Sequence, residues 1–199
     1  MILNPLMRLL QCRSRICKKS LIVYIILFAT LSVFSEEVKK GVLDLRNTNF
    51  NNVKEFTLKG EMGFYNRQFV FSQEDINKSS VFIPCPSEWS QTKLSDGTQL
   101  SSLGYGTYVF KILLPKNSPP LMLKIPSPVS AWAFFVDGKE IMRGGNPGSS
   151  KENSNTGQAD IVYKIPQDKT ELSIAVQVSN FAHSRGGIYH AINIGLQDS

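Results

Sequence analysis

A cluster of polar side chains near the end of the chain has the composition of a ligand-binding loop. Asn180, His183 and Arg185 lie in it, and two glycines follow the arginine. The flanking segments, Glu171–Ser179 and Ile188–Leu196, alternate apolar and polar residues as half-buried strands do. Loops held by a rigid sheet commonly carry binding residues, so we expect a binding site here.

The arrangements typical of catalysis are missing from the sequence pattern. His183 and His190 could act as bases, but no Gly-x-Ser-x-Gly turn accompanies them. No Cys/His set has zinc spacing, and the Gly104–Gly106 segment lacks the lysine and helix of a phosphate-binding loop. The 16 acidic residues always allow some carboxylate pair, so a glycosidase pair cannot be inferred from them. We therefore expect a protein that is not an enzyme and uses no cofactor or metal.

Aromatic rings and planar polar groups suit a saccharide, which presents C–H faces and hydroxyl edges. The candidate ligand-binding residues are Trp89, Tyr105, Asn180, His183, Arg185 and Tyr189. Each also has a structural interpretation: Trp89 could be a core plug, Asn180 could cap backbone, and Arg185 could pair with an acid. Trp132 lies inside an apolar strand, which favours the core, and His190 falls within a predicted strand.

Short apolar stretches bounded by proline and glycine predict many short strands. The expected strands are Val42–Leu45, Phe56–Tyr65, Val81–Ile83, Thr107–Leu114, Leu121–Ile125, Ala131–Val136, Lys139–Arg143, Asp160–Ile165, Leu172–Val178 and Ile188–Leu196. Asp137-Gly138 predicts a two-residue hairpin turn. Gly144–Gln158 reads as an irregular loop, and only Ser72–Ile76 carries a helix-start signature. The pattern predicts an all-β, antiparallel β-sandwich of the jelly-roll type.

The first 35 residues have the organisation of a secretory signal. Five basic residues precede Leu21, and the uncharged apolar run Leu21–Phe34 has 14 residues. That run is shorter than the roughly 20 residues of a membrane-spanning helix. We expect residues 1–35 to be a cleaved signal peptide, with an uncleaved membrane anchor as the alternative. Membrane contact is expected only if cleavage fails.

The remaining residues, 36–199, are expected to form one exported domain. Five of the 22 basic residues lie in the leader, so 22 − 5 = 17 basic residues face 16 acidic ones in the rest of the chain. This near balance of charge gives no reason to expect a nucleic-acid partner. Cys85 is the only cysteine of this part, so it cannot form an internal disulfide. We expect the domain in the periplasm or on the outer face of the inner membrane.

Several segments in order resemble a known domain family. They are Leu43–Arg46, Leu58–Tyr65, Ile83–Pro84 with Trp89, Gly104–Tyr108, Leu113–Pro115, Leu123–Pro126, Val136–Gly138, Val178–Asn180 and Arg185–Tyr189. This order resembles the galactose-binding-like, jelly-roll extracellular sensor domain of bacterial seven-transmembrane receptors with diverse intracellular signalling modules. It is similar, more distantly, to the sugar-binding domain of family 2 glycoside hydrolases. Met62 stands where an aromatic residue is usual, and Asp137 replaces the commoner asparagine.

The resemblance implies a ligand-sensing or carbohydrate-binding module of a signal-transduction receptor type. No seven-helix region or output domain is present in the 199 residues. The expected partner is a small polar ligand such as a saccharide. The alternatives are a protein-interaction module that docks on a membrane receptor protein, and a truncated receptor fragment.

Overall fold

The computed structural model describes residues 37–50, 55–71 and 81–197, which belong to one unit, Ser35–Ser199. The predicted leader, including its apolar helix, and the predicted turn at Ser72–Ile76 lie outside the described residues. Both stay predictions. No helix within the described ranges is long and apolar enough to cross a membrane.

The regular secondary structure of the described residues is almost entirely strand, as the alternating pattern predicts. In chain order the elements are β1 (Glu37–Val38), β2 (Val42–Asp44), β3 (Glu55–Asn66), β4 (Val81–Cys85), the 3-10 helix η2 (Trp89–Gln91), β5 (Gly104–Leu113), β6 (Leu121–Ile125), β7 (Ala131–Val136), β8 (Lys139–Asn146), β9 (Asn155–Thr156), β10 (Ile161–Ile165), β11 (Glu171–Asn180) and β12 (Ile192–Leu196). The predicted Asp137-Gly138 hairpin is confirmed, since both residues have positive φ angles, of 51° and 77°.

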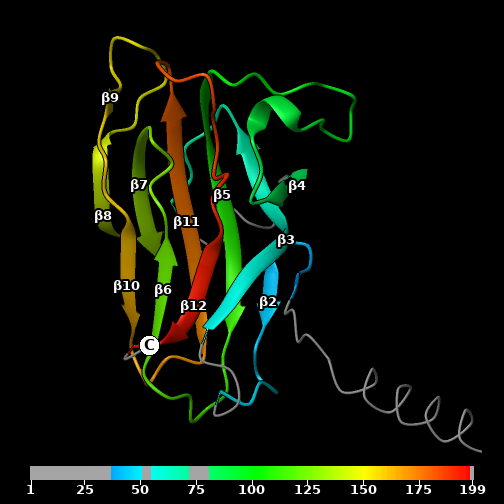
Figure 1. The fold of residues 1–199 in the computed structure, drawn as a ribbon, viewed down its shortest axis with the longest axis vertical. Helices are drawn as coiled ribbons and strands as arrows, with labels where there is room; N and C mark the ends of the chain where they lie inside the picture. Colours follow the sequence, from blue (N-terminus) through cyan, green and yellow to red (C-terminus); the bar gives the residue numbers. More distant parts are fainter. Residues whose placement is uncertain (1–36, 51–54, 72–80, 198–199) are drawn as a thin grey trace, which may run out of the picture. The chain divides into compact units, whose positions relative to one another are not determined.

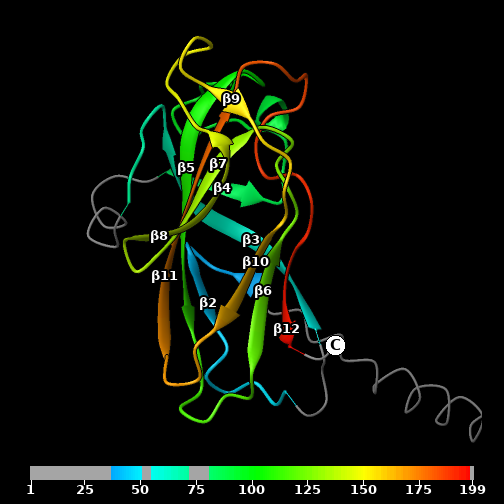
Figure 2. The ribbon, with the colours of Figure 1, turned by 90° about the vertical axis from the view of Figure 1, so that its left-hand side faces the viewer.

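The strands form two layers that face each other across a hydrophobic core. The first layer has the order β4-β3-β5-β11-β7-β8, and the second has the order β10-β6-β12-β3. Figure 2 shows the layers side by side, with β5 and β11 in one and β6 and β12 in the other. This is the expected all-β sandwich. It is not wholly antiparallel, however, because β1 pairs with β3 and β2 with β5 in parallel.

Strand β3 belongs to both layers. Its first residues pair with β12, and the residues from Gly60 onward pair with β4 and β5. Gly60 has a φ of 136°, and a Cβ there would lie 2.2 Å from the Val38 carbonyl oxygen. Only glycine combines this backbone angle with so close a neighbour. Where β3 leaves the first layer, β2 continues the edge of β5.

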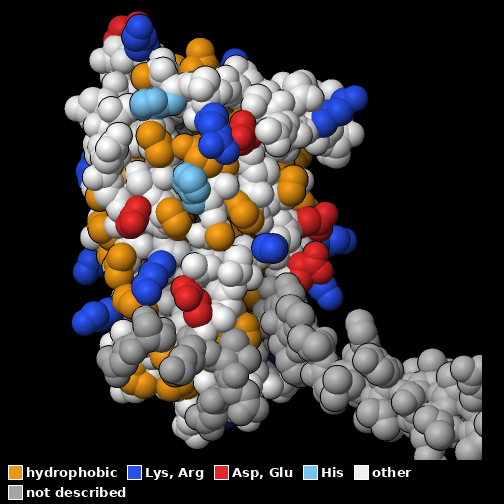
Figure 3. Space-filling model, in the orientation of Figure 1, with side chains coloured by type: hydrophobic (Ala, Val, Ile, Leu, Met, Phe, Trp, Pro, Cys, Tyr) orange, Lys and Arg blue, Asp and Glu red, His pale blue; other side chains and the backbone are white. Residues whose placement is uncertain are grey.

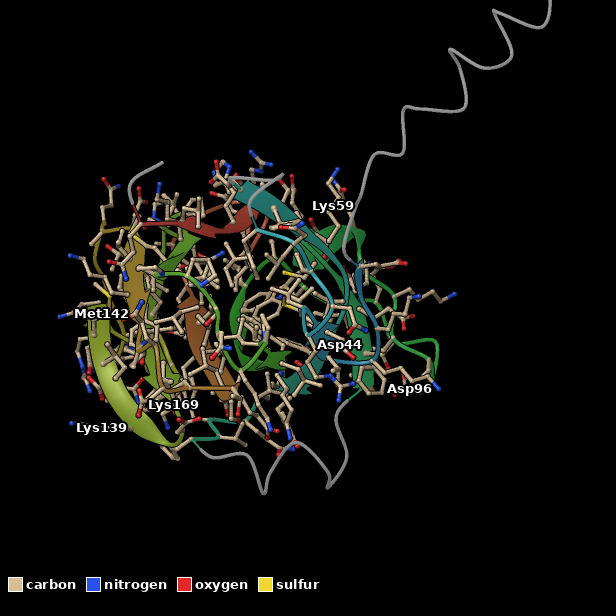
Figure 4. All side chains as sticks on the ribbon, turned by 90° about the horizontal axis from the view of Figure 1, so that it is seen from below. Asp44, Lys59, Asp96, Lys139, Met142 and Lys169 are labelled. Atoms are coloured by element: carbon tan, nitrogen blue, oxygen red, sulfur yellow. The ribbon has the colours of Figure 1, made fainter. Side chains whose placement is uncertain are left out.

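The interior between the layers is filled with apolar side chains. Figure 4 looks along the strands and shows Lys59, Asp96 and Lys139 at the periphery of the domain. Phe134 of β7 and Tyr163 of β10 meet edge to face across the layers, with ring centroids 5.7 Å apart. Trp132 is fully buried, so its predicted place in the core is confirmed.

The first layer is also covered on its outer face. Tyr65, Val109, Ala133, Phe135 and Ala175 form a second buried cluster there. The chain that follows β3 lies over it: Val70 packs on the cluster, and Phe71 stacks edge to face on Phe135 with centroids 5.3 Å apart. Strands β7 and β11 are therefore buried on both faces, which explains their nearly unbroken apolar or small-residue sequences.

Two predictions about segment boundaries are wrong. Strand β12 begins at Ile192, so Ile188, Tyr189 and His190 lie in the preceding loop and not in a strand. The stretch predicted as an irregular loop contains the end of β8 and all of β9, which pair at Gly145–Thr156 and Asn146–Asn155. Buried Ser179 holds this hairpin, since its Oγ accepts a hydrogen bond from Gly148 N at 3.1 Å and lies 2.7 Å from Ser154 Oγ.

Candidate functional site

Three connecting segments gather at one end of the sandwich, the upper end in Figure 1. They are the β4–β5 connection that contains η2, the β8–β9 hairpin, and the loop after β11. All of the predicted ligand-binding residues lie in or beside these segments. The structure divides those residues into three pairs: Asn180 with His183, Arg185 with Tyr189, and Trp89 with Tyr105.

Asn180 organises the loop after β11 from within. Its side chain is fully buried, and Nδ2 donates hydrogen bonds to the carbonyl oxygens of Ser102 at 2.7 Å, His183 at 2.8 Å and Arg185 at 3.2 Å. Its Oδ1 accepts from the backbone N–H groups of His183 at 3.0 Å and Ala182 at 3.4 Å. This geometry matches the backbone-turning interpretation of Asn180, since no part of its amide is free for a ligand.

The two glycines that follow Arg185 serve close packing. A Cβ at Gly186 would lie 2.2 Å from the Ser102 carbonyl oxygen, and one at Gly187 would lie 2.7 Å from the Tyr108 hydroxyl. Gly187 also has a φ of 95°. The carbonyl oxygen of Gly186 accepts a hydrogen bond from Trp89 N at 3.0 Å. The loop is thus pressed onto Trp89, which is only 2% exposed and has the position of a core plug.

Arg185 is exposed, and its guanidinium already has two partners within the protein, Glu88 and Tyr189. Its Nε donates a hydrogen bond to Glu88 Oε1 at 2.7 Å, and its guanidinium carbon lies 4.2 Å from the Tyr189 ring centroid. The Tyr189 and His190 rings are 4.5 Å apart. We call these four residues, Glu88, Arg185, Tyr189 and His190, the Arg185 ledge. Figure 3 shows two histidines on this face, with a basic and an acidic side chain in contact between them and hydrophobic side chains around them.

A pocket of about 360 Å³ is lined in part by Trp89. We call it the Tyr105 pocket. Its lining residues are Phe64, Asn66, Arg67, Trp89, Thr98, Gln99, Leu100, Ser101, Leu103, Gly104 and Tyr105. It combines an aromatic ring, two amides, hydroxyl groups and one arginine, the mixture that suits a small polar ligand with an apolar face.

The backbone around the pocket is fixed by the sheet. Arg67, the residue just after β3, donates a hydrogen bond from its backbone N to the carbonyl oxygen of Tyr105, near the start of β5, at 2.9 Å. The Tyr105 ring packs on Phe69 with centroids 4.9 Å apart. Gln99 is held by its Nε2, which donates to the carbonyl oxygens of Ser90 at 2.9 Å and Thr92 at 2.8 Å. Its amide oxygen makes no hydrogen bond within the described part of the chain.

The structure therefore places two predicted residues, Trp89 and Tyr105, in the pocket lining, and Trp89 contributes there while almost fully buried. Arg185 and Tyr189 meet on the ledge, whereas His183 is half-buried in the loop above Asn180. Asn66, Arg67 and Gln99 were not predicted. Their sequence neighbours carry no signal for a site, because the pocket forms only when the end of β3 and Arg67 come together with the β4–β5 connection and the start of β5.

Two buried groups near the site, the Cys85 thiol and the Tyr108 hydroxyl, are held in their neutral, protonated forms. Burial raises the pKa of the Cys85 thiol and is the largest cause of the raised pKa of Tyr108. The Tyr108 hydroxyl accepts a hydrogen bond from Ile188 N at 3.1 Å, so it helps to anchor the loop. Among the described residues, no group of three or more His, Cys, Asp or Glu side chains could hold a metal ion.

No protein-family model matches the chain, and no curated protein matches its sequence. Among solved structures, the chain is similar to a β-glucuronidase of an uncultured Clostridium species, with a TM-score of 0.51 and 15% identity over 72% of this chain and 29% of that one. It is also similar to the β-glucuronidase of Lactobacillus rhamnosus, with a TM-score of 0.50 and 15% identity over 71% of this chain and 28% of that one. A third is the β-glucuronidase of Ruminococcus gnavus in complex with D-glucuronic acid, with a TM-score of 0.50 and 14% identity over 73% of this chain and 30% of that one.

The chain thus spans less than a third of the length of these enzymes. At such identities the likeness shows the fold alone. It agrees with the more distant of the two sequence resemblances, that to the family 2 glycoside hydrolases, and gives no support to the resemblance to receptor sensor domains. The chain is therefore an all-β sandwich domain that shares its fold with part of the β-glucuronidases.

Proposed function

We propose that this protein is an exported, non-enzymatic β-sandwich module that binds a small saccharide in the Tyr105 pocket. The observation that carries the proposal is the pocket lining, which includes Tyr105, Asn66 and Gln99, with the Tyr105 carbonyl oxygen held by Arg67 N. An aromatic face can pack on the C–H face of a sugar while amides bond its hydroxyl groups.

The fold neighbours add support of a general kind. They are β-glucuronidases, and one of them was solved with D-glucuronic acid. Their activity is not carried over, because this chain spans less than a third of their length. The pocket lining also contains no acidic side chain among the described residues, whereas glycoside hydrolysis commonly uses two carboxylates. Binding without catalysis is the function that this lining favours.

Calorimetric titration of residues 36–199 with a panel of neutral and acidic mono- and disaccharides tests the proposal. Tyr105→Ala is expected to weaken saccharide binding about tenfold, the loss of one aromatic contact of roughly 1.5 kcal/mol. Tyr189→Ala on the Arg185 ledge is the matched control and should bind like the wild type. The reverse pattern would move the site to the ledge, and no binding by any saccharide would refute the function.

Export and a receptor partner belong to the proposal as inferences from the sequence. The charged and apolar leader motivates export, and mass spectrometry of the mature N-terminus tests how the leader acts: a start at Glu36 supports a cleaved signal peptide, and an intact N-terminus supports an uncleaved membrane anchor. Docking on a membrane receptor protein is the alternative function. Its only support is the sequence resemblance, and recovery of one specific membrane protein in a pull-down from envelope extracts tests it.

A further inference from the structure

The arginines of the described residues differ in how they are paired. Four lie there, and three of them form ion pairs with acidic side chains. The pairs are Arg46–Asp44 at 2.5 Å, Arg143–Glu140 at 2.6 Å and Arg185–Glu88 at 2.7 Å. Arg67 has no acidic partner and no side-chain hydrogen bond among the described residues, and it is the arginine that lines the Tyr105 pocket.

Arg67 stands at a backbone position that does not favour arginine. Its φ is 56°, in the left-handed region that residues other than glycine and asparagine seldom adopt. The position is nevertheless fixed by the sheet, since Arg67 N donates to the Tyr105 carbonyl oxygen at 2.9 Å. The next residue is held as well, because the Gln68 carbonyl oxygen accepts from Thr107 Oγ1 at 2.8 Å. Glycine would adopt this backbone conformation with less strain. The backbone conformation is therefore not the reason for an arginine at this position.

Among the described residues, the only charged side chain in the pocket lining is a basic one. The described lining contains one cation, Arg67, and no acidic side chain. The nearby carboxylate of Glu88 is held by Arg185 on the ledge. Asp96 is exposed and its Oδ1 accepts a hydrogen bond from Thr98 N at 2.8 Å, and Figure 4 shows its side chain at the periphery of the domain. The pocket is therefore complementary to an anion.

We propose that the Tyr105 pocket selects a saccharide that carries a carboxylate, which the Arg67 guanidinium binds while the Tyr105 ring packs on the sugar. This inference rests on the proposed function of the pocket. Guanidinium presents a planar pair of N–H donors that matches the two oxygens of a carboxylate, and such charge-assisted bonds are stronger than neutral ones. An unpaired arginine beside an aromatic ring and two amides supplies one partner for each part of an acidic sugar.

Titration with D-glucuronate and D-glucose tests the inference, because the two sugars differ only in the carboxylate at C6. At low salt, glucuronate is expected to bind about tenfold more tightly than glucose, and added NaCl should reduce the difference. Arg67→Gln should abolish the preference. Arg143→Gln is the matched control, since it removes an exposed arginine on β8 and should leave the preference unchanged.

Arg67→Gly provides a second variant whose folding is expected to be intact, because glycine relieves the left-handed backbone. It should melt no lower than the wild type and should show no preference for glucuronate. D-glucose 6-phosphate forms the third arm: tighter binding than glucuronate would overturn the assignment of a carboxylate.

The outcomes separate this inference from the function on which it rests. Equal binding of glucuronate and glucose, or a preference that survives in Arg67→Gln, would overturn the role of Arg67 and leave saccharide binding in place. Binding of neither sugar and of no other saccharide would refute the proposed function itself, and this inference with it.

Discussion

Replacing Asn180 by alanine is expected to lower the free energy of unfolding by about 2–4 kcal/mol. The side chain makes hydrogen bonds to three carbonyl oxygens and two N–H groups and is fully buried. Each buried group left without a partner costs roughly 1–3 kcal/mol. Ala182 and Ser184 are exposed, so water can reach part of the loop and the full sum is not expected.

Urea denaturation followed by tryptophan fluorescence measures this loss, since buried Trp89 lies under the same loop. Asn117→Ala is the matched control, because Asn117 is exposed and its side chain has no hydrogen bond within the described residues. The control should stay within about 0.5 kcal/mol of the wild type. If Asn180→Ala also stays within that range, Asn180 does not organise the loop.

Asn180→Asp sharpens the test through pH. It replaces the Nδ2 donor by an oxygen that faces the carbonyl oxygens of Ser102, His183 and Arg185. Burial and this repulsion should raise the pKa of the introduced carboxyl in the folded state above its unfolded value of about 3.9. The deficit in unfolding free energy relative to the wild type should therefore be small below pH 4 and grow as the pH rises. A deficit that does not change with pH would contradict the geometry.

Two further predictions concern the scaffold. Gly144→Ala should destabilise the domain by about 1–3 kcal/mol in the same urea assay, since its Cβ would lie 2.3 Å from the Trp132 indole nitrogen; an unchanged midpoint would contradict this packing. Partial burial raises the pKa of Asp137, but hydrogen bonds from Lys169 and a backbone N–H outweigh it and hold this pKa below its usual value. Asp137→Asn should therefore cost under about 1 kcal/mol at pH 7, and the difference from the wild type should shrink as the pH falls below about 4; a constant difference would argue against this pairing.

The strands could be predicted because their signal is local. Alternation places Leu121, Leu123 and Ile125 of β6 on the core side, and the structure buries all three. The predictions failed where a distant contact decides the conformation. Ile188 continues the apolar alternation of β12, but its backbone bonds Tyr108 and Ser87 and so lies in the loop.

The site could be predicted only in part for the same reason. Asn180 and Arg185 stand out in the sequence as polar residues in a loop that contains two glycines, yet each also has a partner far away in the chain, Ser102 and Glu88 respectively. Arg67 carries no signal of its own, because being unpaired in a pocket is a property of the fold and not of its neighbours in sequence.

A backbone amide NMR titration of residues 36–199 with D-glucuronate tests the central claim most directly, because it locates a bound saccharide on the sandwich. We expect the largest shift changes at Arg67, Gln99 and Tyr105, with little change at Arg185 and Tyr189. Changes confined to the Arg185 ledge, or no changes up to tens of millimolar with this and the other saccharides, would contradict a saccharide site in the Tyr105 pocket.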